Sequence, residues 1–180
     1  MKYFKKMIGN RIYVSPISID DVEIYASWMN DKEIAKYIHQ SHRLHTIQSE
    51  KVWIENNDKN GDYNFAIIKK DGDKLLGNCG VMNINYIDRT ATLGIFIGEP
   101  KERSNGYGKE VLELLLEFCF NTLNMHNINL NVFSFNETAI SCYKKVGFVE
   151  YARRHEAYFC DGKYHDIISM EILEKDYKKN

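Results

Sequence analysis

The chain has 180 residues and a formal net charge of -1, with 44% apolar and 27% charged residues. These values are typical of one globular domain, which we expect to span residues 1–180. They give no basic surface for nucleic acid and no apolar run near the ~20 residues that cross a membrane. The N-terminal segment lacks the apolar core of a secretory signal, and the four cysteines are too widely spaced for a metal site. We therefore expect a cytoplasmic protein with reduced thiols, no metal, and no membrane or nucleic-acid partner.

The first half of the chain predicts a strand, three helices and a hairpin of two strands. Small polar residues that cap helices mark where the helices begin, and Asp71-Gly72 marks the hairpin turn. The predicted elements are a strand at Asn10–Ile17, a helix from Ser18 through Trp28, a short helix after Asn30–Asp31, a helix that begins at Thr46 or Ser49 and ends in the polar residues Asn56–Gly61, and strands at Tyr63–Lys69 and Leu75–Tyr86.

The central segment combines a strand, a glycine-rich turn and a helix without a gap. Apolar and β-branched residues predict the strand at Thr92–Ile97, and the turn runs from Gly98 to Gly108. The helix that follows is apolar around most of its circumference and keeps a narrow polar stripe, which consists of Glu113, Glu117 and Asn121. We therefore expect this helix to be mostly buried.

The glycine-rich turn has the composition of an anion site. A helix start carries unpaired amides and a partial positive charge, and Gly106 and Gly108 let a bulky anion approach the backbone. The Walker pattern fails because Glu110 follows Gly108-Lys109, and the dinucleotide fingerprint fails because it requires three glycines. The turn therefore predicts a phosphate site of another kind, with Arg103 as an added charge. An ordinary turn that caps a core helix is the alternative.

The last third of the chain predicts a strand, a helix and a hairpin. The strand alternates strictly, and it should return parallel to the strand of the central segment through a right-handed crossover. Gly147 is expected to cap the helix at its C-terminal end. The predicted elements are a strand at Asn127–Phe135, a helix at Asn136–Val146, and strands at Phe148–Cys160 and Tyr164–Leu173 that meet at Asp161-Gly162-Lys163.

Two motifs in this part of the chain resemble the signatures of the Gcn5-related N-acetyltransferases (GNAT). Arg103-Ser-Asn-Gly106-Tyr-Gly108 is similar to the family's Arg-x-x-Gly-x-Gly loop, and the stretch Asn136–Phe148 is similar to its Asn-x-x-Ala-x-x-x-Tyr-x-x-x-Gly-Phe pattern. The resemblance covers most of Thr92–Phe148. It implies an α+β fold whose mostly antiparallel, twisted sheet splays between its two parallel middle strands, with helices on both faces. An α+β domain that carries both patterns by chance is the alternative.

The resemblance also implies the co-substrate acetyl-CoA and the residues that hold it. The loop amides would bind the diphosphate, and the Ile97 N–H would polarise the thioester carbonyl. Tyr143 would protonate the departing thiolate as general acid, and Asn136 would bond the pantetheine arm; core packing and helix capping are the alternatives for these two residues. The implied binding residues are Phe96, Ile97, Gly98, Arg103, Ser104, Asn105, Gly106, Tyr107, Gly108, Lys109, Asn136, Ala139 and Tyr143.

The general base is the part of the site that the motifs leave open. Many relatives place a Glu on the central strand, at about the position where this chain has Thr92. A water chain to bulk solvent, without a dedicated base, is one alternative. Candidate bases elsewhere in the chain are Glu99, His155, Glu156, Asp166, His39, His42 and His45.

The acceptor amine is open as well. Trp28–Ile34 and Asp161–Asp166 loosely resemble the branch that includes ribosomal-protein, spermidine and nucleotide-sugar acetyltransferases. We therefore predict direct acetyl transfer from acetyl-CoA to a primary amine of a polyamine, an amino sugar or a protein N-terminus, by a monomer or a homodimer. The alternative is a sensor domain that binds acetyl-CoA without turnover.

Overall fold

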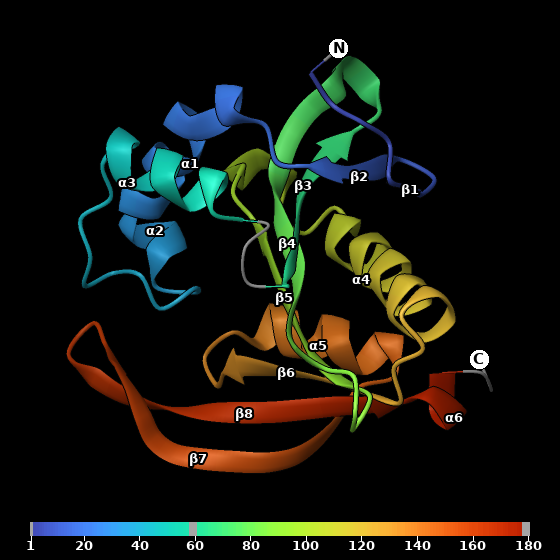
Figure 1. The fold of residues 1–180 in the computed structure, drawn as a ribbon. Coiled ribbons are helices and arrows are strands. Elements are labelled where there is room, and N and C mark those ends of the chain that lie inside the picture. The colour runs from blue at the N-terminus through green and yellow to red at the C-terminus, as the bar shows by residue number, and fades with distance from the viewer. Residues whose placement is uncertain (1, 58–60, 178–180) are drawn as a thin grey trace. The chain divides into compact units, whose positions relative to one another are not determined.

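A computed structural model describes residues 2–57 and 61–177 (Figure 1). Residues 58–60 of the predicted polar stretch Asn56–Gly61 lie outside the described residues. The strands are β1 (Met7–Ile8), β2 (Ile12–Pro16), β3 (Tyr63–Lys69), β4 (Lys74–Asn85), β5 (Thr90–Ile97), β6 (Asn127–Phe133), β7 (Val149–Cys160) and β8 (Lys163–Leu173). The α-helices are α1 (Val22–Asn30), α2 (Lys32–Ala35), α3 (Ile47–Glu55), α4 (Tyr107–Glu117), α5 (Glu137–Val146) and α6 (Glu174–Tyr177). No helix within the described residues is long and apolar enough to cross a membrane.

The strands follow one another in the hydrogen-bonded order β1-β2-β3-β4-β5-β6-β8-β7. The pairs β1–β2, β2–β3, β6–β8 and β7–β8 are antiparallel, and β5–β6 is parallel. In the parallel pair, Thr90–Thr92 of β5 lie opposite Asn127–Asn129 of β6. Within the described part of the chain, this pairing does not continue to the next residues, Leu93 and Leu130. The prediction of a sheet that splays between its two parallel middle strands is confirmed.

The chain divides into two compact units. The first unit consists of Met1–Gly80 and Ile95–Val111, and the second consists of Val81–Gly94 and Leu112–Asn180. Strands β4 and β5 each contribute residues to both units. The two units are described separately below.

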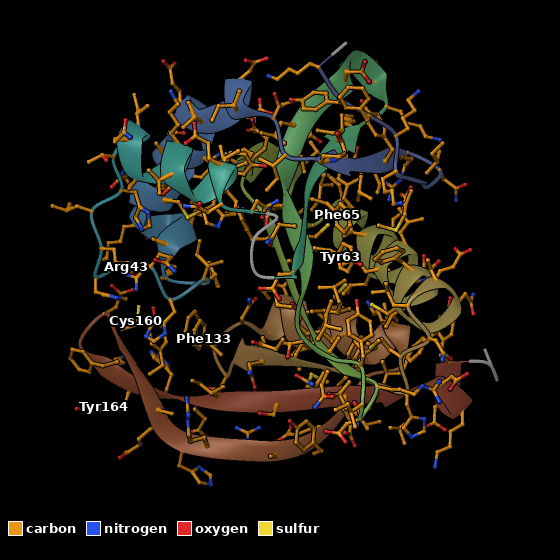
Figure 2. The ribbon with its side chains drawn as sticks, in the orientation of Figure 1. Arg43, Tyr63, Phe65, Phe133, Cys160 and Tyr164 are labelled. Carbon is orange, nitrogen blue, oxygen red and sulfur yellow. The ribbon has the colours of Figure 1, made fainter. Side chains whose placement is uncertain are left out.

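The first unit contains β1, β2, β3 and the helices α1, α2 and α3 (Figure 1). Helices α2 and α3 begin where the sequence predicted, because the side chains of Asp31 and Thr46 accept amide hydrogen bonds. The helix predicted from Ser18 starts instead with a 3₁₀ turn, Ile19–Asp21, and α1 follows without a side-chain cap. Thr46, rather than Ser49, is the N-cap of α3, and the two residues form a reciprocal capping box. The rings of Tyr63 and Phe65, labelled in Figure 2, stack along β3 with centroids 6.3 Å apart. One cluster of the unit's buried core consists of Tyr3, Tyr13, Tyr25, Trp28, Ile34, Ala66, Ile68 and Leu75.

The second unit contains α5, α6 and the strands β6, β7 and β8. Helix α5 lies over one face of β6 and β8 (Figure 1). The alternation predicted for β6 is confirmed, since Ile128, Leu130 and Val132 are buried. At the end of β6 the ring of Phe133 stacks on Tyr158 of β7 with centroids 4.1 Å apart; Figure 2 labels Phe133.

Four features were not predicted. Strand β1 and helix α6 are too short to leave a periodic pattern in the sequence. The end of the central helix, Phe118–Thr122, is a π-helix in which the Leu123 N–H donates to the Phe118 carbonyl at 3.0 Å. A π turn accommodates one more residue than an α turn, and here it accompanies the burial of three consecutive side chains, Phe118 to Phe120. Strand β7 carries register shifts between Glu150 and Ala152 and between Arg154 and Tyr158.

Candidate active site

The segment Gly98–Gly108, hereafter the β5–α4 turn, lies in the first unit and has the geometry of an anion site. Pro100–Glu102 forms a 3₁₀ turn, and the Gly106 carbonyl accepts a hydrogen bond from the Glu110 N–H at 3.4 Å, so α4 begins at Tyr107. Gly106 has φ +82°, a left-handed conformation that glycine adopts without strain. The first amides of α4 lack acceptors within the helix and carry the positive end of its dipole. The predicted succession of strand, turn and helix is therefore present.

Arg103 ties the β5–α4 turn back to the end of β5. Its Nε donates to the Ile97 carbonyl at 3.0 Å, and its Nη2 donates to the Gly98 carbonyl at 3.3 Å. A guanidinium has more donors than these two bonds use, so it can still meet an anion. Arg103 therefore shapes the turn, a role that the sequence did not indicate.

The end of β5 is held from α1. A Cβ added to Gly98 would lie 2.2 Å from Cδ2 of Trp28, so a residue with a side chain does not fit beside the indole ring. The same indole meets the Phe96 ring edge-on, with centroids 5.9 Å apart. The Gly98 N–H already donates to the Leu76 carbonyl of β4 at 2.9 Å. Because neighbouring strand residues direct their backbone groups to opposite sides, the Ile97 N–H points away from β4.

The remaining side chains of the β5–α4 turn differ in exposure. Tyr107 is buried, whereas Ser104, Asn105 and Lys109 are exposed. The side-chain amide of Asn105 donates to the Lys101 carbonyl at 3.2 Å, which closes the turn on itself. These contacts leave the turn backbone, rather than a set of side chains, as the part of the turn that could meet a ligand.

The acidic groups beside the turn are paired with lysines. Lys74 Nζ lies 3.2 Å from the Glu99 carboxylate, so this candidate base is one half of an ion pair. Lys69 Nζ donates to Glu102 at 3.1 Å, and this hydrogen bond lowers the pKa of Glu102. The lysines therefore reduce the negative charge that a diphosphate would meet here.

Helix α5, in the second unit, carries the other motif. The Asn136 Oδ1 accepts the Ala139 N–H at 3.3 Å, so Asn136 is the N-cap of the helix. The cap uses the side-chain oxygen and leaves the NH₂ group as a donor. At the other end Gly147 has φ 109° and closes the helix as predicted.

The Tyr143 ring is buried, and its hydroxyl has no acceptor within residues 2–57 and 61–177. Phe148 meets the ring edge-on, with centroids 6.0 Å apart. Burial raises the pKa of the Tyr143 phenol above its ordinary value of 10.0, and the neighbouring Cys142 adds to the shift. Tyr143 is therefore protonated at neutral pH and has a hydroxyl available to donate.

Thr92 does not replace the missing carboxylate. Its Oγ1 donates to Asn129 Oδ1 of β6 at 2.9 Å, so two uncharged side chains join the parallel strands β5 and β6. A hydroxyl that already donates to an amide oxygen is a poor proton acceptor at neutral pH. The structure therefore brings no general base to the position that relatives use.

The candidate bases of β7 and β8 form one cluster in the second unit. The Asp166 carboxylate accepts the Glu156 N–H at 3.0 Å and Arg153 Nη1 at 3.2 Å, and it lies 3.3 Å from His155 Nδ1. The Glu156 amide, followed by Arg153, lowers the pKa of Asp166. A lowered pKa makes this carboxylate a weaker proton acceptor.

The histidines near α3 are also engaged in contacts. His45 Nδ1 lies 2.7 Å from the Glu50 carboxylate, and both side chains are largely buried. The rings of His39 and His42 meet edge-on with centroids 5.6 Å apart. These contacts place the three histidines in the connection between α2 and α3.

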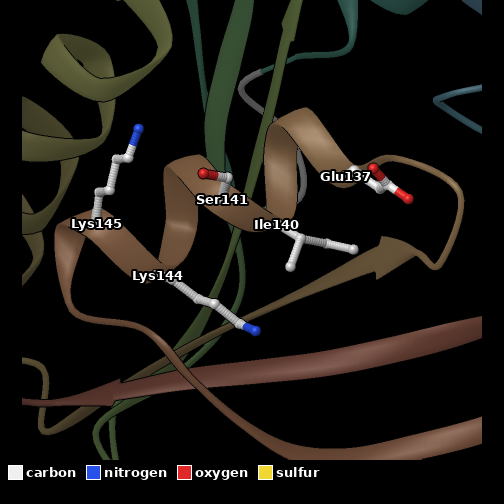
Figure 3. Close-up of a pocket in the computed structure, with 5 residues that line it drawn as sticks. All are labelled: Glu137, Ile140, Ser141, Lys144 and Lys145. Atoms are coloured by element: carbon white, nitrogen blue, oxygen red, sulfur yellow. The ribbon is translucent and has the colours of Figure 1, made fainter.

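A pocket of about 410 Å³ lies on α5, outside the predicted site (Figure 3). The lining side chains recur every three or four residues, so they share one face of the helix. None of the predicted binding residues of α5 lines the pocket. Its lining residues are Glu137, Ile140, Ser141, Lys144 and Lys145.

Comparison with known proteins agrees with this geometry. Residues 11–149 match the family model described as "Acetyltransferase (GNAT) domain". The spermidine N(1)-acetyltransferase of Vibrio cholerae serotype O1 is 28% identical over 171 residues, which cover 94% of this chain and 97% of the relative. The SPbeta prophage-derived uncharacterized N-acetyltransferase YokL of Bacillus subtilis is 25% identical, over 96% of this chain and 95% of the relative.

A solved structure gives the same result in three dimensions. The crystal structure of spermidine N-acetyltransferase from Vibrio cholerae in complex with CoA and spermine has a TM-score of 0.85 to this chain, with 25% identity, and covers 93% of this chain and 98% of that one. The family model alone spans most of the sequence and includes both motifs. The chain therefore belongs to the GNAT acetyltransferases, and it is an acetyl-CoA-dependent amine N-acetyltransferase.

Proposed function

We propose that the protein acetylates a primary amine of a polyamine, such as spermidine or spermine, and that residues 1–180 act as one acetyltransferase domain in the cytoplasm. Similarity to a spermidine N(1)-acetyltransferase over nearly the whole chain supports the polyamine acceptor. The buried, reduced thiols of Cys79, Cys119 and Cys160 support a reducing compartment. The observation that carries the transferase proposal is the β5–α4 turn, whose backbone presents helix-start amides beside a left-handed glycine.

The residues of the first unit fit the donor. The amides of Ser104 to Lys109 and the guanidinium of Arg103 would hold the diphosphate of acetyl-CoA. The outward backbone of Ile97 would pair with an amide of the pantetheine arm, while Phe96 and Gly98 fix the strand through Trp28. This assignment refines the sequence expectation, because the Gly98 amide is already paired within the protein.

The chemistry needs three actions from the protein. Acetyl-CoA supplies an activated acyl group and a thiolate leaving group. The Ile97 N–H would polarise the acyl carbonyl as a single donor. Tyr143 would give its proton to the sulfur, and a hydroxyl that donates to no described residue is available for this role. Asn136 and Ala139, at the start of α5, would position the arm that carries the sulfur.

The amine loses its proton to water in this proposal. The Thr92 hydroxyl bonds Asn129, and hydrogen bonds weaken Asp166 as a base. With no dedicated base, kcat/KM should rise with pH toward the pKa of the amine, which is ~10 for an alkyl ammonium. A plateau that begins near pH 7 would instead indicate a protein base.

The test is an acceptor screen by thiol release. The panel contains spermidine, spermine, an amino sugar, an aminoglycoside and a peptide with a free N-terminus, each with acetyl-CoA. We expect turnover with the polyamines and little with the others. Preference for an amino sugar or a peptide would contradict the polyamine acceptor. Thermal stabilisation by CoA without turnover on any amine would indicate a sensor domain.

A further inference from the structure

Arg11 reaches the β5–α4 turn from outside both sequence motifs. Its Nη1 donates to the Asn105 carbonyl at 2.8 Å, and its guanidinium carbon lies 4.6 Å from the centroid of the Tyr107 ring. A Cβ added to Gly106 would lie 3.3 Å from its Nη2. One side chain therefore lies against three successive residues of the turn.

Glu110, on the first turn of α4, fixes Arg11 in this position. Its Oε1 accepts the Arg11 N–H at 2.7 Å and the Ile12 N–H at 3.3 Å, and its Oε2 accepts Arg11 Nε at 3.1 Å. A Cβ added to Gly9 would lie 2.5 Å from the Glu110 Oε1, so the β1–β2 turn passes close to this carboxylate. The carboxylate thus holds both the backbone and the guanidinium of Arg11, which leaves that side chain little freedom.

Two other cations near the turn, Arg103 and Lys69, make hydrogen bonds to other groups. Arg103 donates to carbonyls at the end of β5, on the strand side of the turn. Lys69 pairs with Glu102 and lies 5.9 Å from the centroid of the Tyr107 ring. Arg11 is the group that braces the side of the turn next to α4, where the helix-start amides lie.

We propose that Arg11 is a positioning residue for the diphosphate of acetyl-CoA. A glycine-rich loop without a brace samples many conformations, and ordering each residue costs about 1–2 kcal/mol. Arg11 fixes the segment from Asn105 to Tyr107 before the donor binds, so the donor does not have to order it. The inference rests on the proposed function, because it assumes that this turn binds the diphosphate.

The test compares CoA and acetyl-CoA with S-acetylpantetheine, which lacks the diphosphate together with the adenosine 3′-phosphate attached to it. For Arg11→Met we expect the Kd for CoA, measured by calorimetry, to rise ~10-fold or more. The bound CoA would then have to order about one residue of the turn that Arg11 orders in the wild type. The KM for acetyl-CoA should rise in parallel with little change in kcat. The rate constant kcat/KM for S-acetylpantetheine, which lacks the diphosphate, should stay within about twofold of the wild-type value.

Two further variants separate positioning from charge and from stability. Arg11→Lys keeps the charge but loses the planar fork that donates to Asn105 while it stacks on Tyr107, so it should resemble Arg11→Met. Recovery of wild-type CoA affinity in Arg11→Lys would overturn the positioning role. Arg89→Met is the matched control, because Arg89 donates to the Asn124 carbonyl at 2.6 Å and to Glu174 at 3.2 Å, and all three residues belong to the second unit. It should lower the unfolding temperature without changing the CoA affinity.

Failure of this inference and failure of the proposed function give different results. If the wild-type protein does not bind CoA, the proposed function is wrong. If the wild-type protein binds CoA and Arg11→Met binds it equally well, only the role of Arg11 is wrong. Equal losses of affinity for CoA and of rate with S-acetylpantetheine would also overturn it, since the diphosphate would then not be the group that Arg11 serves.

Discussion

The β5–α4 turn and helix α5 each carry one sequence motif, yet they are held in different ways. Helix α5 is held at its own ends, by the Asn136 cap and the left-handed Gly147. The turn is held by residues far away in the chain, Arg11 from the start of β2 and Trp28 from α1. A motif built from helix caps therefore specifies its own structure, whereas a glycine-rich loop acquires its shape from the fold around it.

The largest expected effect concerns chemistry on α5. Tyr143→Phe removes the hydroxyl but keeps the ring that packs on Phe148. We expect kcat to fall roughly 100-fold, the lower end of what general acid catalysis provides, with the KM for acetyl-CoA within about twofold of wild type. Steady-state kinetics with saturating amine measures both values. Loss of CoA binding with no selective effect on kcat would show that Tyr143 is a packing residue.

The second prediction tests the long-range support of the turn. Gly98→Ala places a Cβ only 2.2 Å from the nearest atom of the rigid Trp28 indole. We expect it to lower the free energy of unfolding by about 2 kcal/mol, as overpacking of a core does. The matched control is Gly94→Ala, whose Cβ would meet the flexible end of Met82 at 2.8 Å. In urea unfolding the control should lose clearly less stability; equal losses would contradict the role of Trp28.

Local signals predicted much of the fold, and long-range contacts explain what they missed. Gly147 and the alternation of Ile128, Leu130 and Val132 mark their elements because each signal lies within a few residues. The bond from Arg11 to Asn105 spans 94 residues and leaves no periodic trace in the sequence. The motifs gave the residues of the turn, but the groups that brace it could be found only in three dimensions.

The carbonyl partners of Arg103 show the same limit. The motif predicted a charge beside an anion, and the structure adds hydrogen bonds to Ile97 and Gly98 that a spacing pattern does not encode. Thr92 differs from Arg103, because the sequence alone showed that a threonine replaces the carboxylate that many relatives have at this position. Its bond to Asn129 then depends on the parallel register of β5 and β6.

A third prediction separates the two roles of Asn136. Asn136→Ala removes the cap and should lower the free energy of unfolding by about 1 kcal/mol. Asn136→Asp keeps an oxygen that can accept the Ala139 N–H, and its charge suits a helix start, so stability should be retained. The aspartate lacks the NH₂ donor, so the KM for acetyl-CoA should rise if Asn136 bonds the pantetheine arm. An unchanged KM would leave Asn136 as a cap alone.

The smallest effect is a pH dependence at the brace of the turn. Burial on its own would raise the pKa of Glu110, but hydrogen bonds from the Arg11 and Ile12 amides and from the Arg11 side chain outweigh it, and the pKa is lowered from 4.5. The stabilisation is therefore complete above pH 4.5 and is lost as the pH falls through the lower pKa of the folded state. Urea unfolding of the wild type and of Glu110→Gln should show a stability difference at pH 7 that shrinks below about pH 4.5. In an Arg11→Met background, the stability lost on acidification should be smaller, because the Arg11 side chain no longer lowers the pKa of Glu110. A difference that stays constant to about pH 3 would show that the brace does not depend on the charge of this carboxylate.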